Sequence, residues 1–287
     1  MSQYDIYTGL LKAFPLPDEK QDAVNFSYVF EHPKFDLLKN KYPIVEVAGH
    51  GNDFSKAVNL LHWVSNNIYH MGNYMGSIPA NAIDYLDHAF NKDALHGINC
   101  VGLSTVLSEC LLSIGIKARK VFIMPCSPYD GDNHVVVQAY IKEMGKWIMF
   151  DPTLNAYLNN EKGEYLSLLE LRSHLADQAS VFFNKEAKYN DDIWTEESAK
   201  SNIEYLAKNL FYFQMPEINT FNEGNDPIDA QQSRLFALCP QGFCPGRIFL
   251  SNVEYRKRLY GEQPWMKDAI EHASTFKYYF CSTSDFE

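Results

Sequence analysis

The sequence predicts an α+β fold, with a core of helices and a sheet and additions before and after this core. Three observations indicate the fold class. An apolar helix begins at Cys100, a strand rich in β-branched residues begins at His134, and another strand ends at Asp151. A short turn separates the two strands, so we expect them to pair antiparallel.

The chain before the core is predicted to be an N-terminal extension covering residues 1–53. Prolines interrupt it at Pro15, Pro17, Pro33 and Pro43. Within it, Lys41 to Val47 is expected to form a strand. A leading helix follows, because Phe54 to Tyr69 has apolar residues at helical spacing. We then expect a loop over 70–79 that could line a cleft, and a short helix over 82–90.

The next helix is the one that carries Cys100. Val101 to Ile114 has apolar residues three and four apart, and Gly115 supplies a C-terminal stop. Cys100 therefore lies at or just before the first turn. There the free N–H groups and the helix dipole favour a thiolate and could stabilise an oxyanion. Taken alone, Cys100 would more often be a small buried core residue.

His134 lies where a loop meets a strand. Residues 127–133 have strong turn chemistry, and Val135 to Ile141 has the composition of a strand. We expect the sheet to fix His134 firmly while leaving it open to a cleft. A neutral imidazole at that place can take a thiol proton and return it to a leaving amine. The alternative is a polar histidine at a hairpin end.

Asp151 ends the strand that follows. Lys142 to Gly145 is a predicted hairpin turn, and Lys146 to Phe150 is the returning strand. His134 and Asp151 are 17 residues apart with the turn near the middle, so folding back brings them together. A carboxylate beside an imidazole fixes its tautomer and stabilises the imidazolium. Asp-Pro-Thr is also a good strand-ending turn, and the two interpretations are compatible.

These segments resemble the transglutaminase-like superfamily of papain-fold cysteine enzymes, over a predicted core of about residues 54–156. The resemblance is carried by the leading helix, the Cys100 helix, Gly115-Ile-Lys-Ala-Arg-Lys-Val121, Asn133-His134-Val, and Lys146-Trp-Ile-Met-Phe-Asp-Pro-Thr153. It implies that Cys100 is the nucleophile, His134 the general base and acid, and Asp151 the orienting carboxylate. It also implies a papain-like α+β core in which the cysteine-bearing helix packs on an antiparallel sheet.

The resemblance implies chemistry through a thioester formed from an amide carbonyl. Hydrolysis of a peptide-like or amide-containing small substrate is the leading hypothesis, as in a peptidase or amidase. The first alternative is an acyltransferase that passes the acyl group to an amine. The second is a catalytically inactive binding module, against which the presence of Cys100, His134 and Asp151 argues.

Further residues are candidates for contacts with substrate or an oxyanion. Tyr74 could donate a hydrogen bond to the oxyanion, and Asn99 and Asn133 precede the proposed nucleophile and base. His62 and His70, on the leading helix and at its end, are expected to be structural.

A metal site is not expected. Cys239 and Cys244, with His272 and Cys281 downstream, could suggest a zinc site, but their spacing is loose. The two cysteines Cys239 and Cys244 are interpreted as free thiols in a Pro/Gly turn. No cofactor is expected either.

The C-terminal part, residues 157–287, is predicted to be a family-specific addition and part of one elaborated domain covering 1–287. Within it we expect a helix over 166–176. The apolar, aromatic run 201–215 is expected to return to the core, and 216–246 is expected to form long loops.

Composition narrows the function classes. The chain has 287 residues, 46% of them hydrophobic, and a net charge of −11 without a basic stripe, which argues against nucleic-acid binding. No stretch has the roughly 18–20 apolar residues of a membrane span, and the first residues lack the features of a signal peptide. With six cysteines and no dense disulfide pattern, a reduced, cytoplasmic protein is expected. The sequence does not define an oligomeric state.

Overall fold

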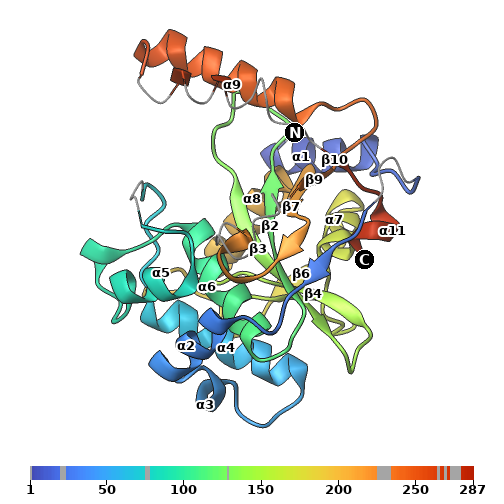
Figure 1. The fold of residues 1–287 in the computed structure, drawn as a ribbon. Coiled ribbons are helices and arrows are strands. Elements are labelled where there is room, and N and C mark those ends of the chain that lie inside the picture. Colours follow the sequence, from blue (N-terminus) through green and yellow to red (C-terminus); the bar gives the residue numbers. More distant parts are fainter. Residues whose placement is uncertain are drawn as a thin grey trace.

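A mixed sheet forms the centre of the molecule (Figure 1). The computed structural model describes residues 2–19, 24–74, 78–127, 129–224, 234–263, 266–267, 270–271 and 279–287. The strands of the sheet are β2 Ala118–Met124, β3 His134–Ile141, β4 Lys146–Phe150, β7 Tyr212–Pro216, β9 Leu235–Leu238 and β10 Tyr279–Phe280. Their order is β10-β9-β7-β2-β3-β4. Neighbours from β9 to β4 are antiparallel, and β10 runs parallel to β9 at one edge. The α+β class is confirmed, and the sheet is antiparallel except at that edge.

One face of the sheet is covered by the helices of the first half of the chain. They are α2 Pro33–Lys41, α3 Ile44–Ala48, α4 Asp53–Asn67, α5 Ala82–Ala89 and α6 Cys100–Ser113. Helix α6 lies directly on β2 and β3, and α2, α4 and α5 pack around it. Every residue of α6 from Gly102 to Ser113 is buried, as its apolar composition predicts.

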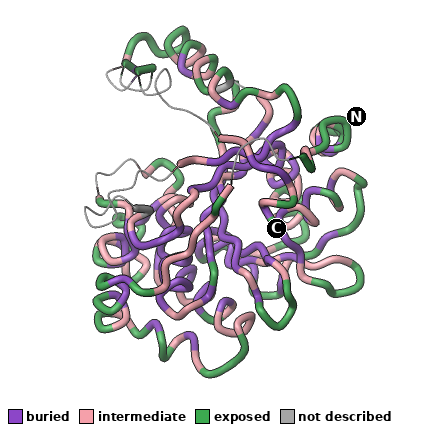
Figure 2. Tube along the Cα trace, turned by 45° about the vertical axis from the view of Figure 1, so that its right-hand side comes forward, coloured by how far each residue is buried: buried purple, intermediate pink, exposed green. Residues whose placement is uncertain are grey.

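The opposite face is covered by α1 Gln3–Ala13, α7 Leu168–Ala176 and α8 Glu196–Asn209. Because side chains alternate along a strand, Val137 and Ala139 of β3 join the first core while Val136 joins the second. The sheet is therefore buried on both sides, as the purple interior of Figure 2 shows. The predicted helix over 166–176 and the return of residues 201–215 to the core are confirmed.

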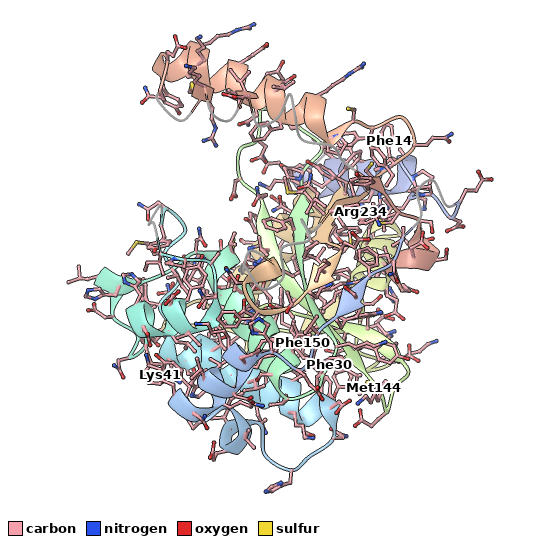
Figure 3. The ribbon with its side chains drawn as sticks, in the orientation of Figure 1. Phe14, Phe30, Lys41, Met144, Phe150 and Arg234 are labelled. Atoms are coloured by element: carbon pink, nitrogen blue, oxygen red, sulfur yellow. The ribbon has the colours of Figure 1, made fainter. Side chains whose placement is uncertain are left out.

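The hairpin of β3 and β4 forms as predicted. Residues 142–145 make the turn, with Gly145 in the left-handed region at φ 62°. Tyr140 pairs with Trp147, and Val137 with Phe150. Figure 3 shows Phe150 within the body of the molecule and Met144 of the turn at its rim.

Smaller elements complete the described chain. Strand β1 Ser27–Tyr28 pairs with β8 Ile218–Asn219, and β5 Leu158–Asn160 pairs with β6 Val181–Phe183. The 3-10 helices are η1 Ala94–His96 and η2 Phe221–Gly224, and the last helices are α9 Pro245–Tyr260 and α11 Thr283–Phe286. Helix α9 projects from the body at the top of Figure 1. In the described part of the chain, no helix has the length and apolar character needed to cross a bilayer.

Two predictions about local structure were wrong. Lys41 to Val47 is not a strand: α2 ends at Lys41, and α3 begins at Ile44. The β-branched residues of this run suggested a strand, but Ile44 and Ala48, four apart, are buried together at helical spacing. Residues 216–246 are not only loops, because β8, η2 and β9 lie within them. Part of this range, 225–233, lies outside the described residues.

Candidate active site

Cys100 is the first residue of α6, where the sequence places it. Asn99 caps the helix, since its Oδ1 accepts a hydrogen bond of 3.1 Å from the backbone N–H of Gly102. The residue before the cap, Ile98, is tied to the end of the leading segment by its N–H, which donates to the carbonyl of Tyr69 at 3.0 Å. The partly buried thiol thus sits at the positive end of a buried helix dipole.

His134 and Asp151 are joined by a short hydrogen bond. Nε2 of His134 lies 2.7 Å from Oδ2 of Asp151, and the two residues are 4% and 1% exposed. Continuing the hairpin register places Asp151 opposite Val136, two residues from His134 on the same face. The other carboxylate oxygen, Oδ1, accepts backbone N–H groups of Thr153 and Leu154 at 2.9 and 3.3 Å. These bonds fix the carboxylate with Oδ2 aimed at the imidazole.

Two imidazoles, those of His134 and His70, lie close enough to the thiol of Cys100 to act on its pKa. Burial raises the pKa of this thiol, but the hydrogen bonds and positive charge of the histidines outweigh it and bring the pKa from 9.0 to about 6. For His134, burial lowers the pKa, whereas Asp151 and Cys100 raise it from 6.5 to about 10. Between these values the favoured pair is a thiolate and an imidazolium.

This environment distinguishes Cys100 from other thiols of the chain. Burial raises the pKa of a further group of cysteines, namely Cys110, Cys126, Cys239 and Cys281. For Cys239 and Cys281 the pKa rises to about 12. Activation is therefore a property of the position of Cys100.

The geometry agrees with the comparison to known families. The sequence profile of the transglutaminase-like superfamily matches residues 44–152, a range that contains Cys100, His134 and Asp151. Residues 44–152 are thus similar to a transglutaminase-like core. The core predicted from the sequence was 54–156, so the match begins earlier, at α3.

Two solved structures are similar to part of the chain. A candidate cysteine protease from Cytophaga hutchinsonii has 20% identity and a TM-score of 0.34, over 59% of this chain and 55% of its own. A candidate protease from Parabacteroides distasonis has 15% identity and a TM-score of 0.30, over 46% of this chain and 29% of its own. This chain thus spans about half, and under a third, of their lengths. Comparison with curated proteins finds no match.

Two residues outside the matched range 44–152, Tyr189 and Asn190, position His70 beside Cys100. His70 follows α4, and its Nδ1 lies 2.9 Å from the hydroxyl of Tyr189. Its backbone is bracketed by the side chain of Asn190, which accepts from the N–H at 2.8 Å and donates to the carbonyl at 3.2 Å. Since Nδ1 is engaged, Nε2 is the nitrogen left for the thiol of Cys100.

The second contribution from outside the core is Tyr205 of α8. Its ring meets that of His134 edge-on, with centroids 5.7 Å apart. Its hydroxyl donates to Oδ1 of Asp132 and to the carbonyl of Asn133, at 3.3 and 3.2 Å. Burial, followed by the charges of Asp132 and Cys100, raises the pKa of Tyr205, so its hydroxyl stays protonated. His134 therefore lies under a tyrosine, and the expectation that it is open to a cleft was wrong.

Sequence reasoning missed the role of His70. His62 fits a structural assignment, with Nδ1 2.7 Å from Oδ1 of Asn155, whereas His70 also acts on the thiol, whose pKa it lowers. The loop over 70–79 was expected to line a cleft, and the position of His70 at its start is the signal that could have identified it. Residues 75–77 of this loop lie outside the described residues.

The other predicted contact residues have different partners. The ring of Tyr74 packs beside that of His88 at 5.8 Å, and its buried hydroxyl has no hydrogen-bond partner among the described residues. The side chain of Asn99 is used by the helix cap and by a 3.3 Å bond to the carbonyl of Tyr74. Asn133 borders a hollow of about 260 Å³ that Arg256 of α9 also lines.

No group of three or more potential metal ligands occurs within the described ranges. Cys239 and Cys281 are buried free thiols there, whereas His272, considered with them, lies outside those ranges. A second hollow, of about 450 Å³, extends from Tyr189 along the first turns of α8, where Ser201 and Asn202 line it. Neither hollow is lined by Cys100, His134 or Asp151, but Tyr189, which bonds His70, and Asn133, which precedes His134, border them.

Proposed function

We propose that this protein is a cysteine-dependent amide-bond enzyme that acts through a thioester on Cys100. The observation that carries the proposal is a thiol at a helix N-terminus, whose pKa is lowered by a histidine that lies 2.7 Å from the carboxylate of Asp151. This arrangement has the parts that nucleophilic acyl transfer requires: an activated thiolate, a proton carrier and a group that orients the carrier.

The proposed reaction has two stages. The thiolate of Cys100 attacks the amide carbonyl carbon, a C–S bond forms, and the carbonyl electrons move to oxygen. As the C–N bond breaks, the imidazolium of His134 gives its proton to the leaving amine and becomes neutral. In the second stage neutral His134 takes a proton from water or an amine, which attacks the thioester and releases Cys100.

Hydrolysis is the proposed outcome of the second stage. Cys100 remains partly exposed, so water can reach the thioester. The substrate is then a peptide or a small amide, which the polar hollow bordered by Tyr189 and the more apolar one bordered by Asn133 could accommodate. We further propose a cytoplasmic site of action, where these thiols remain reduced.

Acyl transfer to an amine is the second candidate, and one observation favours it. His134 is 4% exposed beneath Tyr205. A covered base would limit the access of water to the reacting centre and give a bound amine an advantage.

Product analysis tests both candidates. Wild-type protein is incubated with a mixture of acyl-peptide amides, with and without hydroxylamine, and the products are identified by mass spectrometry. Free acids indicate hydrolysis, and hydroxamates that replace them indicate transfer. Cys100→Ala should give neither while keeping its circular dichroism spectrum. Activity in that variant, or its absence in the wild type across a broad mixture, would favour the binding-module alternative.

A further inference from the structure

The backbone of His70 is fixed by hydrogen bonds, although His70 lies at the start of a loop. Its N–H and carbonyl are both bonded to the side chain of Asn190, which is itself 8% exposed. The next residue, Met71, donates its N–H to the carbonyl of Ile98 at 2.9 Å, two residues before Cys100. The imidazole therefore has a fixed position relative to the start of α6.

The hydroxyl of Tyr189 can set the proton arrangement of the His70 ring. Burial raises the pKa of Tyr189, so its hydroxyl keeps its proton and can donate it to Nδ1 of His70 at 2.9 Å. The planes of the His70 and Tyr189 rings are inclined at 71°, and their centroids are 5.4 Å apart. With Nδ1 as acceptor, the ring proton is on Nε2, the nitrogen left for Cys100.

We propose that His70 is a further catalytic residue, whose Nε2–H donates a hydrogen bond to the oxyanion formed when Cys100 attacks the carbonyl. Tyr189 is the positioning residue that keeps the proton on Nε2. The inference rests on the proposed function. When the C–S bond forms, the carbonyl oxygen gains the electron pair and accepts this bond. When the C–N bond breaks, the pair returns and His70 retains its proton.

The two imidazoles beside Cys100 thus have different tasks. His134 is bonded to the carboxylate of Asp151, which supports a positive charge and hence proton transfer. His70 is bonded to the hydroxyl of Tyr189, which sets a tautomer without adding charge. A fixed donor in a half-buried site suits electrostatic stabilisation of an oxyanion.

Two reactions of Cys100 separate this role from thiol activation. Acylation by p-nitrophenyl acetate forms an oxyanion, whereas alkylation by iodoacetamide displaces iodide at a saturated carbon and forms none. Rates are followed on the Cys100 peptide by mass spectrometry across pH. The plateau values, where the thiol is fully ionised, are then compared, so that changes in the pKa of Cys100 do not enter.

For His70→Ala we expect the acylation plateau to fall about 10²–10³-fold while the alkylation plateau is unchanged or slightly higher. His70→Gln retains an N–H donor and should recover part of the acylation rate. His62→Ala is the matched control, because His62 lies on α4 with a similar hydrogen bond but is not among the residues that perturb Cys100. It should leave both plateaus unchanged.

Tyr189→Phe gives a readout that a purely structural role would not change. In nitrogen-15 NMR of His70, the Nε2–H tautomer should dominate in the wild type and lose its dominance in Tyr189→Phe. Acylation and alkylation that fall in parallel in His70→Ala, or do not fall, would overturn the inference. If wild-type Cys100 is acylated no faster than Cys126, the proposed function fails and takes this inference with it.

Discussion

Replacing Asp151 with asparagine tests how the site activates its thiol. The change keeps the size and the Oδ1 acceptor for the N–H groups of Thr153 and Leu154, so the turn after β4 should remain. It places an amide NH₂ where Oδ2 faces Nε2 of His134 at 2.7 Å. Nε2 must then accept a hydrogen bond, which puts the ring proton on Nδ1 and leaves no acceptor for the thiol proton.

The size of the effect of Asp151→Asn on turnover follows from the pKa values of His134 and Cys100. The rise of the His134 pKa from 6.5 to about 10 corresponds to about 5 kcal/mol in favour of the imidazolium, and Asp151 is its main cause. Without that charge, the Cys100 pKa moves from about 6 back toward 9.0. At pH 7 the share of thiolate is about 90% for a pKa of about 6, and it falls toward about 1% as the pKa approaches 9.0. Turnover should fall about 10³–10⁴-fold, as it does when serine triads lose their carboxylate.

The assay is iodoacetamide labelling of Cys100 from pH 5 to 10, read by peptide mass spectrometry. The midpoint of labelling should lie near pH 6 in the wild type and at least about one pH unit higher in Asp151→Asn. Asp132→Asn is the matched control, because Asp132 bonds Tyr205 rather than His134, and its midpoint should stay near the wild-type value. An unchanged midpoint in Asp151→Asn, or an equal change in the control, would refute the reasoning.

The remaining predictions address pH, access and stability. A lowered thiol pKa of about 6 and a raised histidine pKa of about 10 predict a kcat/KM that rises through the first value and falls through the second; an optimum below pH 5 would contradict this. Tyr205→Ala exposes His134 to water, so the ratio of hydroxamate to free acid should fall in the hydroxylamine assay. An unchanged ratio would show that Tyr205 does not limit the access of water to the site. Arg119→Met should lower the free energy of unfolding, measured by urea titration, by about 2–4 kcal/mol. It leaves the buried Oε1 of Gln138 without its donor and removes a guanidinium that lies 4.3 and 4.4 Å from the ring centroids of Trp147 and Phe286. A loss below about 0.5 kcal/mol would be inconsistent with this. Gly97→Ala would place a methyl group 2.8 Å from the backbone carbonyl oxygen of Tyr69, beside the site. This should lower the free energy of unfolding by about 1–3 kcal/mol and slow the acylation of Cys100. Full stability and full acylation together would contradict the packing argument.

The parts of the site that could be predicted are those that local pattern determines. Cys100 begins a helix whose cap at Asn99 and stop at Gly115 are visible in the sequence. His134 and Asp151 flank one hairpin, so a turn of known position fixes their register. Each of these relations spans fewer than about 20 residues, within the range where periodicity and turn chemistry decide structure.

The parts that could not be predicted depend on contacts far apart in sequence. Tyr189 and Asn190 reach His70 across 119 and 120 residues, and Tyr205 reaches Asn133 across 72. No periodic pattern links such positions. The short helix at Ile44 was missed for a related reason, since its burial against α4 overrides the strand preference of its β-branched residues.

The most direct test of the account is to locate the acyl group. Wild-type protein is mixed with p-nitrophenyl acetate at pH 7, quenched in acid within seconds, and mapped by peptide mass spectrometry. The account predicts an acetyl group on Cys100 that disappears with time, faster when an amine is added, and that forms slowly in His134→Ala. Acetylation spread over Cys126, Cys244 and the lysines at similar rates, with none favoured at Cys100, would contradict the claim that this thiol is the nucleophile.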